Sequence, residues 1–127
     1  MSGGGRILVV DDVARNIRLL ETLLTPEGYE VIAASSGTEA LDRVGDASPD
    51  VVLLDISMPG LSGIDALPTI RAIAPRAVVI MISATEDAAI AKRALAYGAF
   101  DYLVKPIDLT YLRRSIETAL LMAQPEL

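Results

Sequence analysis

The stretch "ILVVDD", residues 7–12, decides the fold and raises the first question about function. Four apolar residues, three of them β-branched, run directly into the neighbouring carboxylates of Asp11 and Asp12. A short continuous apolar run is typical of a strand that is covered on both faces, as in a parallel sheet. The two like charges at its end are either the N-cap of a helix or groups that are held together for chemistry.

The same kind of apolar run recurs four times along the chain. These runs occupy residues 31–34, 51–54, 78–82 and 102–104. Helical periodicity follows each run, such as the 4-3-4 spacing of apolar residues from Val13 to Leu24. Strict alternation of strand and helix predicts the α/β class, with helices on both faces of a parallel sheet. We therefore expect a (βα)5 doubly wound sheet in the flavodoxin-like strand order 2-1-3-4-5.

Turn residues indicate where the first two helices begin and end. Pro26 and Gly28 should end the first helix, because proline and glycine seldom continue one. Ser36 or Thr38 should open the second helix as its N-cap, and Gly45 is expected to close it.

Pro68 conflicts with a regular third helix, because proline inside a helix lacks an N–H donor and clashes with the preceding turn. The alternatives are a kink or a late start near residues 65–67. We favour the late start, since proline suits a first turn. The fourth helix is predicted over residues 86–97, ending before Gly98, and Asp108 is expected to cap the fifth.

Composition excludes several classes of function. The 127 residues include no cysteine and no histidine, which excludes disulfides, thiolate nucleophiles, zinc–thiolate sites and imidazole chemistry. A net charge of −6, a single Phe and no Trp argue against direct binding to nucleic acid, which needs clustered cations and stacking surfaces. The sequence has no membrane-spanning apolar run and no signal-peptide pattern, so we expect one cytoplasmic domain without a membrane contact.

Polar side chains follow four of the five expected strands. Asp11 and Asp12 come after the first strand, Asp55 after the third, Ser83 after the fourth and Lys105 after the fifth. Because the carboxyl ends of parallel strands share one edge, these groups should meet at the switch point between strands 1 and 3. Three clustered carboxylates repel one another unless cations compensate them. Lys105 offsets one charge, and oxygen ligands favour Mg²⁺, with Mn²⁺ as a substitute, for the rest.

A hydroxyl and an ammonium beside such a metal would suit the oxygens of a phosphoryl group carried by a carboxylate. Each residue alone has a simpler explanation. The aspartate pair could cap the first helix, Ser83 could cap the fourth, and Lys105 could be a surface charge. Independent caps do not explain why all of them lie at the same ends of their strands, so we interpret them as one site.

The segments that carry these residues resemble a known family. The stretches "ILVVDD", "VVLLDISMPGLSGID", "VIMISA" and "GAFDYLVKP" closely resemble the receiver domains of two-component response regulators, the CheY-like superfamily. The resemblance covers residues 6–123, with residues 1–5 expected to be a flexible N-terminal segment and residues 124–127 a C-terminal tail. It implies a phosphoprotein of phosphorelay signal transduction, which assists only its own phosphorylation and dephosphorylation and is not an enzyme.

The resemblance implies a role for each matching position. Asp55 would be the phosphoacceptor. Mg²⁺ would be held directly by Asp12, through water by Asp11, and by Asp55 and the backbone carbonyl of Ser57. The phosphoryl oxygens would meet Ser83, Ala84 and Lys105.

The resemblance also implies a switch. Ser83 and Tyr102 would form it, with Tyr102 turning inward as Ser83 moves toward the phosphoryl group. Pro106 matches a proline that usually follows a cis peptide bond. Ser57 and Thr85 match positions that tune the lifetime of the acyl phosphate.

The partners that the resemblance implies are proteins. A histidine kinase or a histidine phosphotransfer protein would donate the phosphoryl group, which agrees with the absence of histidine from this chain. Phosphorylation would shift the population of the face formed by the fourth helix, the fifth strand and the fifth helix. That face would serve partner binding or homodimerisation.

Two other classes of function remain open from the residues alone. A Mg²⁺-dependent phosphohydrolase with an aspartate nucleophile commonly needs a second aspartate two residues later, where this chain has Ser57. A flavin or nucleotide binding module of the same fold needs a phosphate-cradling loop after the first strand. The two aspartates found there would repel a phosphate that arrives without a metal.

Overall fold

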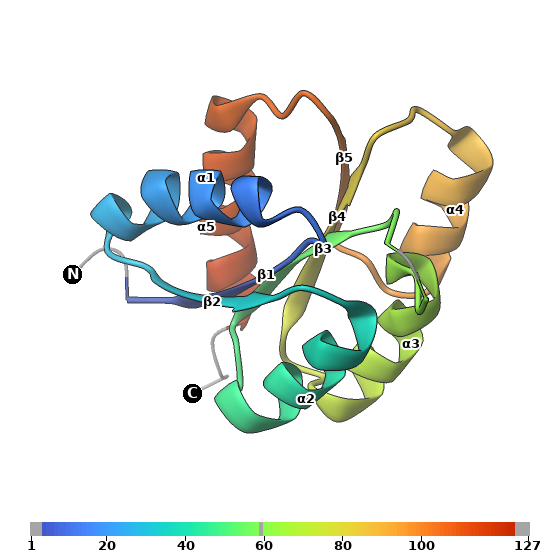
Figure 1. The fold of residues 1–127 in the computed structure, drawn as a ribbon, viewed down its shortest axis with the longest axis horizontal. Coiled ribbons are helices and arrows are strands. Elements are labelled where there is room, and N and C mark those ends of the chain that lie inside the picture. Colours follow the sequence, from blue (N-terminus) through green and yellow to red (C-terminus); the bar gives the residue numbers. More distant parts are fainter. Residues whose placement is uncertain (1–3, 59, 124–127) are drawn as a thin grey trace.

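The computed structural model describes residues 4–58 and 60–123, and a parallel sheet of five strands forms its centre (Figure 1). The strands are β1 (Arg6–Val10), β2 (Glu30–Ala34), β3 (Val51–Asp55), β4 (Val78–Ser83) and β5 (Asp101–Val104). Their hydrogen-bonded order is β2-β1-β3-β4-β5, which confirms the predicted topology. Residues 1–3 and 124–127, which belong to the predicted flexible segment and tail, lie outside the described residues.

Helices cover both faces of the sheet, as predicted. They are α1 (Ala14–Leu24), α2 (Gly37–Ala47), α3 (Gly63–Ile73), α4 (Ala88–Ala96) and α5 (Leu109–Ala123), with a short 3-10 turn, η1 (Thr25–Glu27), after α1. Helices α1 and α5 lie on one face, whereas α2, α3 and α4 lie on the other (Figure 1). In the part of the chain that the structure describes, no helix is both long and apolar enough to span a bilayer.

The sheet separates two hydrophobic cores. Successive strand residues point to opposite faces, so Ile7 and Val9 of β1 pack with α1 and α5, and Leu8 and Val10 pack with α2 and α3. All four side chains are fully buried, which explains why the central strands are continuous apolar runs. This packing holds the carboxyl ends of the strands in a fixed register.

The predicted late start of the third helix is wrong. Helix α3 begins at Gly63 and contains Pro68 in its second turn. Ser62 caps the helix, because its hydroxyl accepts a hydrogen bond from the Asp65 N–H at 3.2 Å and donates to the Asp65 carboxylate at 3.0 Å. The cap begins the helix before the proline is reached, and Pro68 is accommodated on the exposed side.

The second helix begins as predicted but ends later. The hydroxyl of Ser36 accepts from the Glu39 N–H at 3.1 Å, so Ser36 and not Thr38 is the N-cap. Gly45 does not close the helix, which continues to Ala47 and ends at Ser48 with a left-handed φ of 49°.

The fourth helix is shorter than predicted at both ends. It begins at Ala88 because Asp87 is its N-cap, accepting hydrogen bonds from the backbone N–H groups of two following residues, so Glu86 lies before the helix. Gly98 follows with a φ of 101°, a left-handed conformation that favours glycine. Asp108 caps α5 as predicted, accepting from the Thr110 N–H at 2.9 Å.

The first and last described elements meet at the amino edge of the sheet, where the strands begin. The backbone of Gly5, just before β1, lies against the side chain of Leu120 in the last turns of α5. Arg6 ties this edge together, since its Nε donates to Glu30 at 3.0 Å and its backbone N–H donates to Asp50 at 2.8 Å. The predicted polar site lies at the opposite edge.

Candidate functional site

The register of the sheet brings the predicted site residues together at its carboxyl edge. Val10 of β1 pairs with Leu54 of β3, so the aspartates that follow these two residues become neighbours. One carboxylate oxygen each from Asp11, Asp12 and Asp55 lie within 4.8 Å of one another. The convergence predicted for strands 1 and 3 is therefore observed.

Asp11 is buried and its carboxylate already has partners. It accepts hydrogen bonds from the Val13 N–H at 2.9 Å and from the side-chain amide of Asn16 at 3.1 Å. Val13 is the N-cap residue of α1 and is 42% exposed, and no described side chain accepts a capping hydrogen bond from the first turn of this helix. The aspartate pair therefore does not cap this helix, and Val13 does not belong to its buried face.

Asp12 differs from Asp11 because its side chain is exposed. Among the described residues, no hydrogen bond or ion pair to the Asp12 carboxylate is found. Both of its oxygens are thus available to a ligand in the space that it shares with Asp55.

Lys105 reaches the two buried carboxylates from the end of β5. Its Nζ lies 3.7 Å from Oδ2 of Asp11 and 3.9 Å from Oδ2 of Asp55. These separations are ion pairs but are longer than direct hydrogen bonds. The backbone N–H of Lys105 donates to the Ser83 carbonyl at 2.8 Å, and the bond to Pro106 is cis, as expected.

The acidity of Asp55 is strongly perturbed. The pKa of Asp55 is raised from 3.8 to about 6, first because the carboxyl is buried and second because the charge of Asp11 lies close to it. Lys105 and the Ser57 N–H, which donates to Oδ1 of Asp55 at 3.3 Å, lower the pKa only in part. One lysine therefore does not compensate this cluster, and an oxygen-only donor set with excess negative charge fits Mg²⁺ or Mn²⁺.

Ser83 and Tyr102 meet on one acceptor. Ser83 is buried, and its hydroxyl donates to the Thr85 carbonyl at 2.9 Å and accepts from the Thr85 N–H at 3.1 Å. The Tyr102 hydroxyl, from the neighbouring strand β5, donates to the same carbonyl at 3.1 Å. Ser83 does not cap α4, because Asp87 does so. A direct link thus joins the hydroxyl at the carboxyl edge to the aromatic side chain on β5.

Two contributors to this site were missed by sequence reasoning. Asn16 orients Asp11 from the first turn of α1, and a polar residue in that turn could have indicated it. The Thr85 carbonyl has no signal in the sequence, because every residue carries a carbonyl. The predicted phosphoryl-binding position Ala84 is exposed beside them.

Comparison with known proteins agrees with this geometry. The family model described as "Response regulator receiver domain" matches residues 7–117. The chain belongs to the response regulator receiver family. It is therefore a CheY-like phosphoacceptor domain of two-component signal transduction, a class that signals by being phosphorylated. The phosphohydrolase alternative is not favoured.

Individual relatives differ in how much of their length this receiver domain spans. It is 42% identical over 120 residues to the regulatory protein AtoC of Escherichia coli K12, covering 94% of this chain but 26% of AtoC. It is 41% identical over 106 residues to the chemotaxis protein CheY of Thermotoga maritima, covering 83% of this chain and 88% of CheY. The crystal structure of a CheY-like receiver domain from Methanospirillum hungatei JF-1 matches with a TM-score of 0.89 at 28% identity, covering 94% of this chain and 95% of that one.

Proposed function

We propose that Asp55 accepts a phosphoryl group from the phosphohistidine of a histidine kinase or histidine phosphotransfer protein. The observation that carries this assignment is the convergence of Asp11, Asp12 and Asp55 within 4.8 Å, with Lys105 beside them. We assign the acceptor role to Asp55 because it matches the phosphoacceptor position of the family and has the Lys105 ammonium 3.9 Å away. Receiver domains receive phosphoryl groups from such donors, and this chain has no histidine of its own.

The transfer needs Asp55 in its ionised form. An Oδ atom of Asp55 forms a bond to phosphorus while the bond from phosphorus to the donor's imidazole nitrogen breaks, and the electron pair leaves with that nitrogen. A pKa of about 6 keeps this carboxyl ionised at neutral pH. The Lys105 ammonium, 3.9 Å from Asp55, would stabilise charge on the phosphoryl oxygens, together with Ser83 and the backbone at Ala84.

The unequal environments of the aspartate pair support different roles toward Mg²⁺. Asp12 is exposed, so we assign it as the direct ligand, with Asp55 and the Ser57 carbonyl. Asp11 already accepts two hydrogen bonds and would act through water. Bound Mg²⁺ would supply positive charge at the phosphoryl oxygens, and Mn²⁺ would substitute for it.

The shared carbonyl of Thr85 supports a switch between Ser83 and Tyr102. A serine hydroxyl has a single proton, so Ser83 cannot donate to a phosphoryl oxygen and to the Thr85 carbonyl at once. Once the Ser83 hydroxyl had turned to the phosphoryl group, the Tyr102 hydroxyl would still donate to the Thr85 carbonyl. This hydrogen bond would then tie the loop after β4 to strand β5. We infer that this exchange carries the phosphorylation signal to β5.

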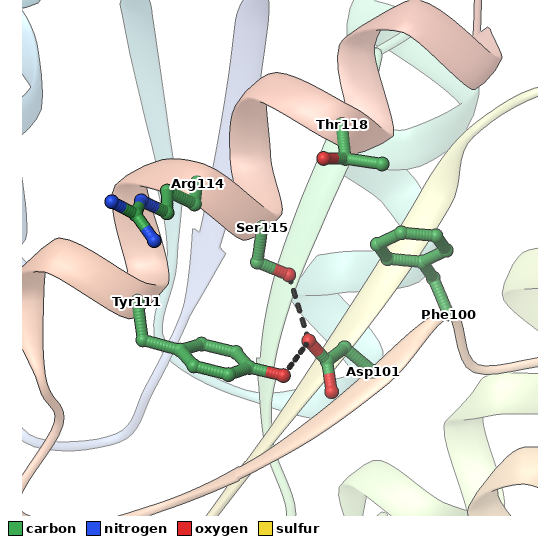
Figure 2. A pocket seen from close by; sticks show the side chains of 6 residues that line it. All are labelled: Phe100, Asp101, Tyr111, Arg114, Ser115 and Thr118. Atoms are coloured by element: carbon green, nitrogen blue, oxygen red, sulfur yellow. Dashed lines mark hydrogen bonds between the residues drawn. The ribbon is translucent and has the colours of Figure 1, made fainter.

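The signal would then reach the face formed by α4, β5 and α5. Asp101, at the start of β5, accepts from the backbone N–H of Tyr102 at 2.8 Å, next to the switch residue. Figure 2 shows Tyr111 and Ser115 of α5 pointing at the Asp101 carboxylate, to which each donates at 2.9 Å beside a cavity of about 310 Å³. Strand β5 is an edge strand that contacts α4, and Leu95 of α4 is 52% exposed. We propose this face for a partner protein or a second copy.

The donor would approach from a different side. An apolar groove of about 330 Å³ lies between α1 and the start of α5, and Asp11 and Lys105 are among the residues that line it. Leu19 and Leu109 line it and are 56% and 44% exposed. Because the donor's imidazole must come from another molecule and reach Asp55, we assign this groove to the phosphodonor protein.

The direct test is phosphorylation by acetyl phosphate with Mg²⁺, followed by intact-mass measurement. We expect one phosphoryl adduct on the wild type and none on Asp55→Asn, which keeps the side-chain shape but removes the nucleophile. An undiminished adduct on Asp55→Asn would overturn the assignment. Sustained turnover of a phosphate monoester, many times the amount of protein, would instead restore the phosphohydrolase. A cytosolic location, expected from the sequence, stays a prediction.

A further inference from the structure

Two glycines contact the connection between β3 and α3, of which the structure describes residues 56–58 and 60–62. The first is Gly63, the opening residue of α3. A Cβ atom at Gly63 would lie 2.3 Å from the carbonyl oxygen of Asp55 and 2.9 Å from the Cα of Ile56, closer than real side chains approach. The Gly63 N–H donates to the Ile56 carbonyl at 3.1 Å, which closes the loop on itself. The start of α3 therefore lies directly against the backbone of the phosphoacceptor.

The second glycine holds the far side of the loop. A Cβ atom at Gly37, the opening residue of α2, would lie 2.5 Å from the Leu61 carbonyl oxygen and 3.0 Å from the Leu61 Cβ. Leu61 packs against the core on the α2 and α3 side of the sheet. Neither glycine is among the described residues with positive φ, so both are required by space and not by an unusual backbone conformation.

Ser57 lies in the sequence between Ile56, which Gly63 approaches, and Leu61, which Gly37 approaches. Its N–H donates to Oδ1 of Asp55 at 3.3 Å, and its carbonyl is the metal ligand assigned above. Mg²⁺ requires near-ideal octahedral geometry with ligand distances near 2.1 Å, so a displacement of a few tenths of an ångström at one carbonyl weakens binding. An alanine at either glycine requires at least such a displacement.

We propose that Gly37 and Gly63 are positioning residues of the phosphoacceptor site, which set the place of the Ser57 carbonyl and of the Asp55 carboxylate. The proposal rests on the function proposed for Asp55 and Ser57. The two glycines touch no reacting atom. They act through the connection between β3 and α3. Because α2 and α3 each begin with a glycine, which has no side chain, this backbone can lie close to the start of both helices.

The chain offers a matched control at Gly45. This residue also lies in α2, but a Cβ atom there would meet nothing within 4 Å. Gly45→Ala should therefore leave the site unchanged and should stabilise the helix. A second control, Ile116→Val in α5, removes a buried methyl from the other core and separates general loss of stability from loss of positioning.

The test combines Mg²⁺ titration by calorimetry with the rate of phosphorylation by acetyl phosphate. We expect Gly63→Ala to bind Mg²⁺ roughly tenfold more weakly and to be phosphorylated at least tenfold more slowly, with Gly37→Ala changing both in the same direction. Both controls should keep the wild-type values. Leu61→Ala removes the side chain that packs beside Gly37 and adds no atom, and it should also weaken Mg²⁺ binding. This variant tests the positioning role if Gly63→Ala does not fold.

Wild-type Mg²⁺ affinity in folded Gly37→Ala and Leu61→Ala would overturn the proposal, as would equal losses in Ile116→Val. A wild type that binds Mg²⁺ but takes no phosphoryl group would instead overturn the function proposed for Asp55. In that case the Mg²⁺ titrations of the glycine variants still decide whether the loop is positioned in this way.

Discussion

Arg6 at the amino edge of the sheet and Lys105 at the carboxyl edge are both single cations among acidic side chains, yet their surroundings differ. Arg6 donates directly to Glu30 at 3.0 Å and also to the Ala47 carbonyl, and its ion pair is largely exposed to solvent. Lys105 stands 3.7 and 3.9 Å from two carboxylates that are almost fully buried, Asp11 and Asp55. At the amino edge Arg6 is paired with Glu30, whereas at the carboxyl edge the single ammonium of Lys105 faces a cluster of three carboxylates.

The difference shows what each edge contributes. Paired groups that are exposed to water stabilise a fold slightly and carry no chemistry. Buried carboxylates without full compensation cost stability and create a demand for a cation. Four experiments would break or sharpen this contrast.

The largest effect on the phosphorylation rate is expected from Lys105→Met, which keeps the unbranched apolar part of the side chain and removes the terminal ammonium. Phosphorylation by acetyl phosphate should slow by roughly 100-fold, because charge on the phosphoryl oxygens loses a fixed cation. Unfolding in urea with a chelator should show a loss of about 2 kcal/mol, since two buried carboxylates lose their shared partner. A phosphorylation rate within twofold of wild type would contradict the role of Lys105.

The next effect is a dependence of stability on pH. The pKa of Asp55 is raised from 3.8 to about 6, so between these values the folded protein holds a proton that the unfolded chain has released. The free energy of unfolding should therefore fall as pH rises from about 4 to about 6, by up to about 3 kcal/mol, and this contribution should then stay constant.

Urea titrations of metal-free wild type and Asp55→Asn across this range would measure that contribution as their difference. Saturating Mg²⁺ should shrink it, because the cation favours the ionised carboxylate. If metal-free wild type gained stability relative to Asp55→Asn from pH 4 to 6, the carboxyl would be stabilised by its surroundings and the contrast between the edges would fail.

A smaller effect should distinguish docking of the phosphodonor protein in the groove between α1 and α5 from the phosphoryl transfer itself. Leu19→Glu places a charge in the apolar groove that Asp11 also lines, so phosphotransfer from an autophosphorylated histidine kinase that recognises the wild type should fall about tenfold. Acetyl phosphate, which needs no docking, should react at the wild-type rate. Ile73→Glu, at another exposed apolar position, is the control. Equal loss with both donors would show that the substitution damages the site itself.

The smallest effect is expected at the amino edge. Arg6→Met removes an exposed ion pair and a hydrogen bond to a carbonyl, and should cost about 1 kcal/mol in urea unfolding. Its Mg²⁺ affinity and phosphorylation rate should equal those of wild type. A loss of Mg²⁺ binding in this variant would mean that the two edges are coupled, contrary to the comparison.

Much of the fold and site could be predicted from the sequence because two patterns are long-range in their consequences. Five apolar runs imply a parallel sheet, and a parallel sheet brings every strand end to one edge. Asp11, Asp12, Asp55, Ser83 and Lys105 could therefore be grouped without any knowledge of distance. Their individual roles follow from the family resemblance and stay predictions.

The features that could not be predicted depend on local competition or on close approach. Pro68 suggested a late helix start, but the Ser62 cap outweighed the disfavoured proline. Gly45 was predicted to close α2 and is an open position within it, whereas Gly37 and Gly63, for which the sequence gives no signal, are in tight contact. A single sequence shows that a residue is glycine but not which neighbour leaves it no space.

The meeting of Gly5 with Leu120 has a consequence for how this domain can be used. Strand β1 begins and α5 ends at the amino edge, away from the acidic site (Figure 1). The start of β1 and the end of α5 are close together and far from the acidic site. A domain of this kind, which we call a cassette, can be appended to another chain or inserted within one. Such a cassette suits both relatives, since the matched segment makes up 26% of AtoC and 88% of CheY. Fluorescent reporters joined at this edge should leave the groove that we propose for the phosphodonor protein uncovered.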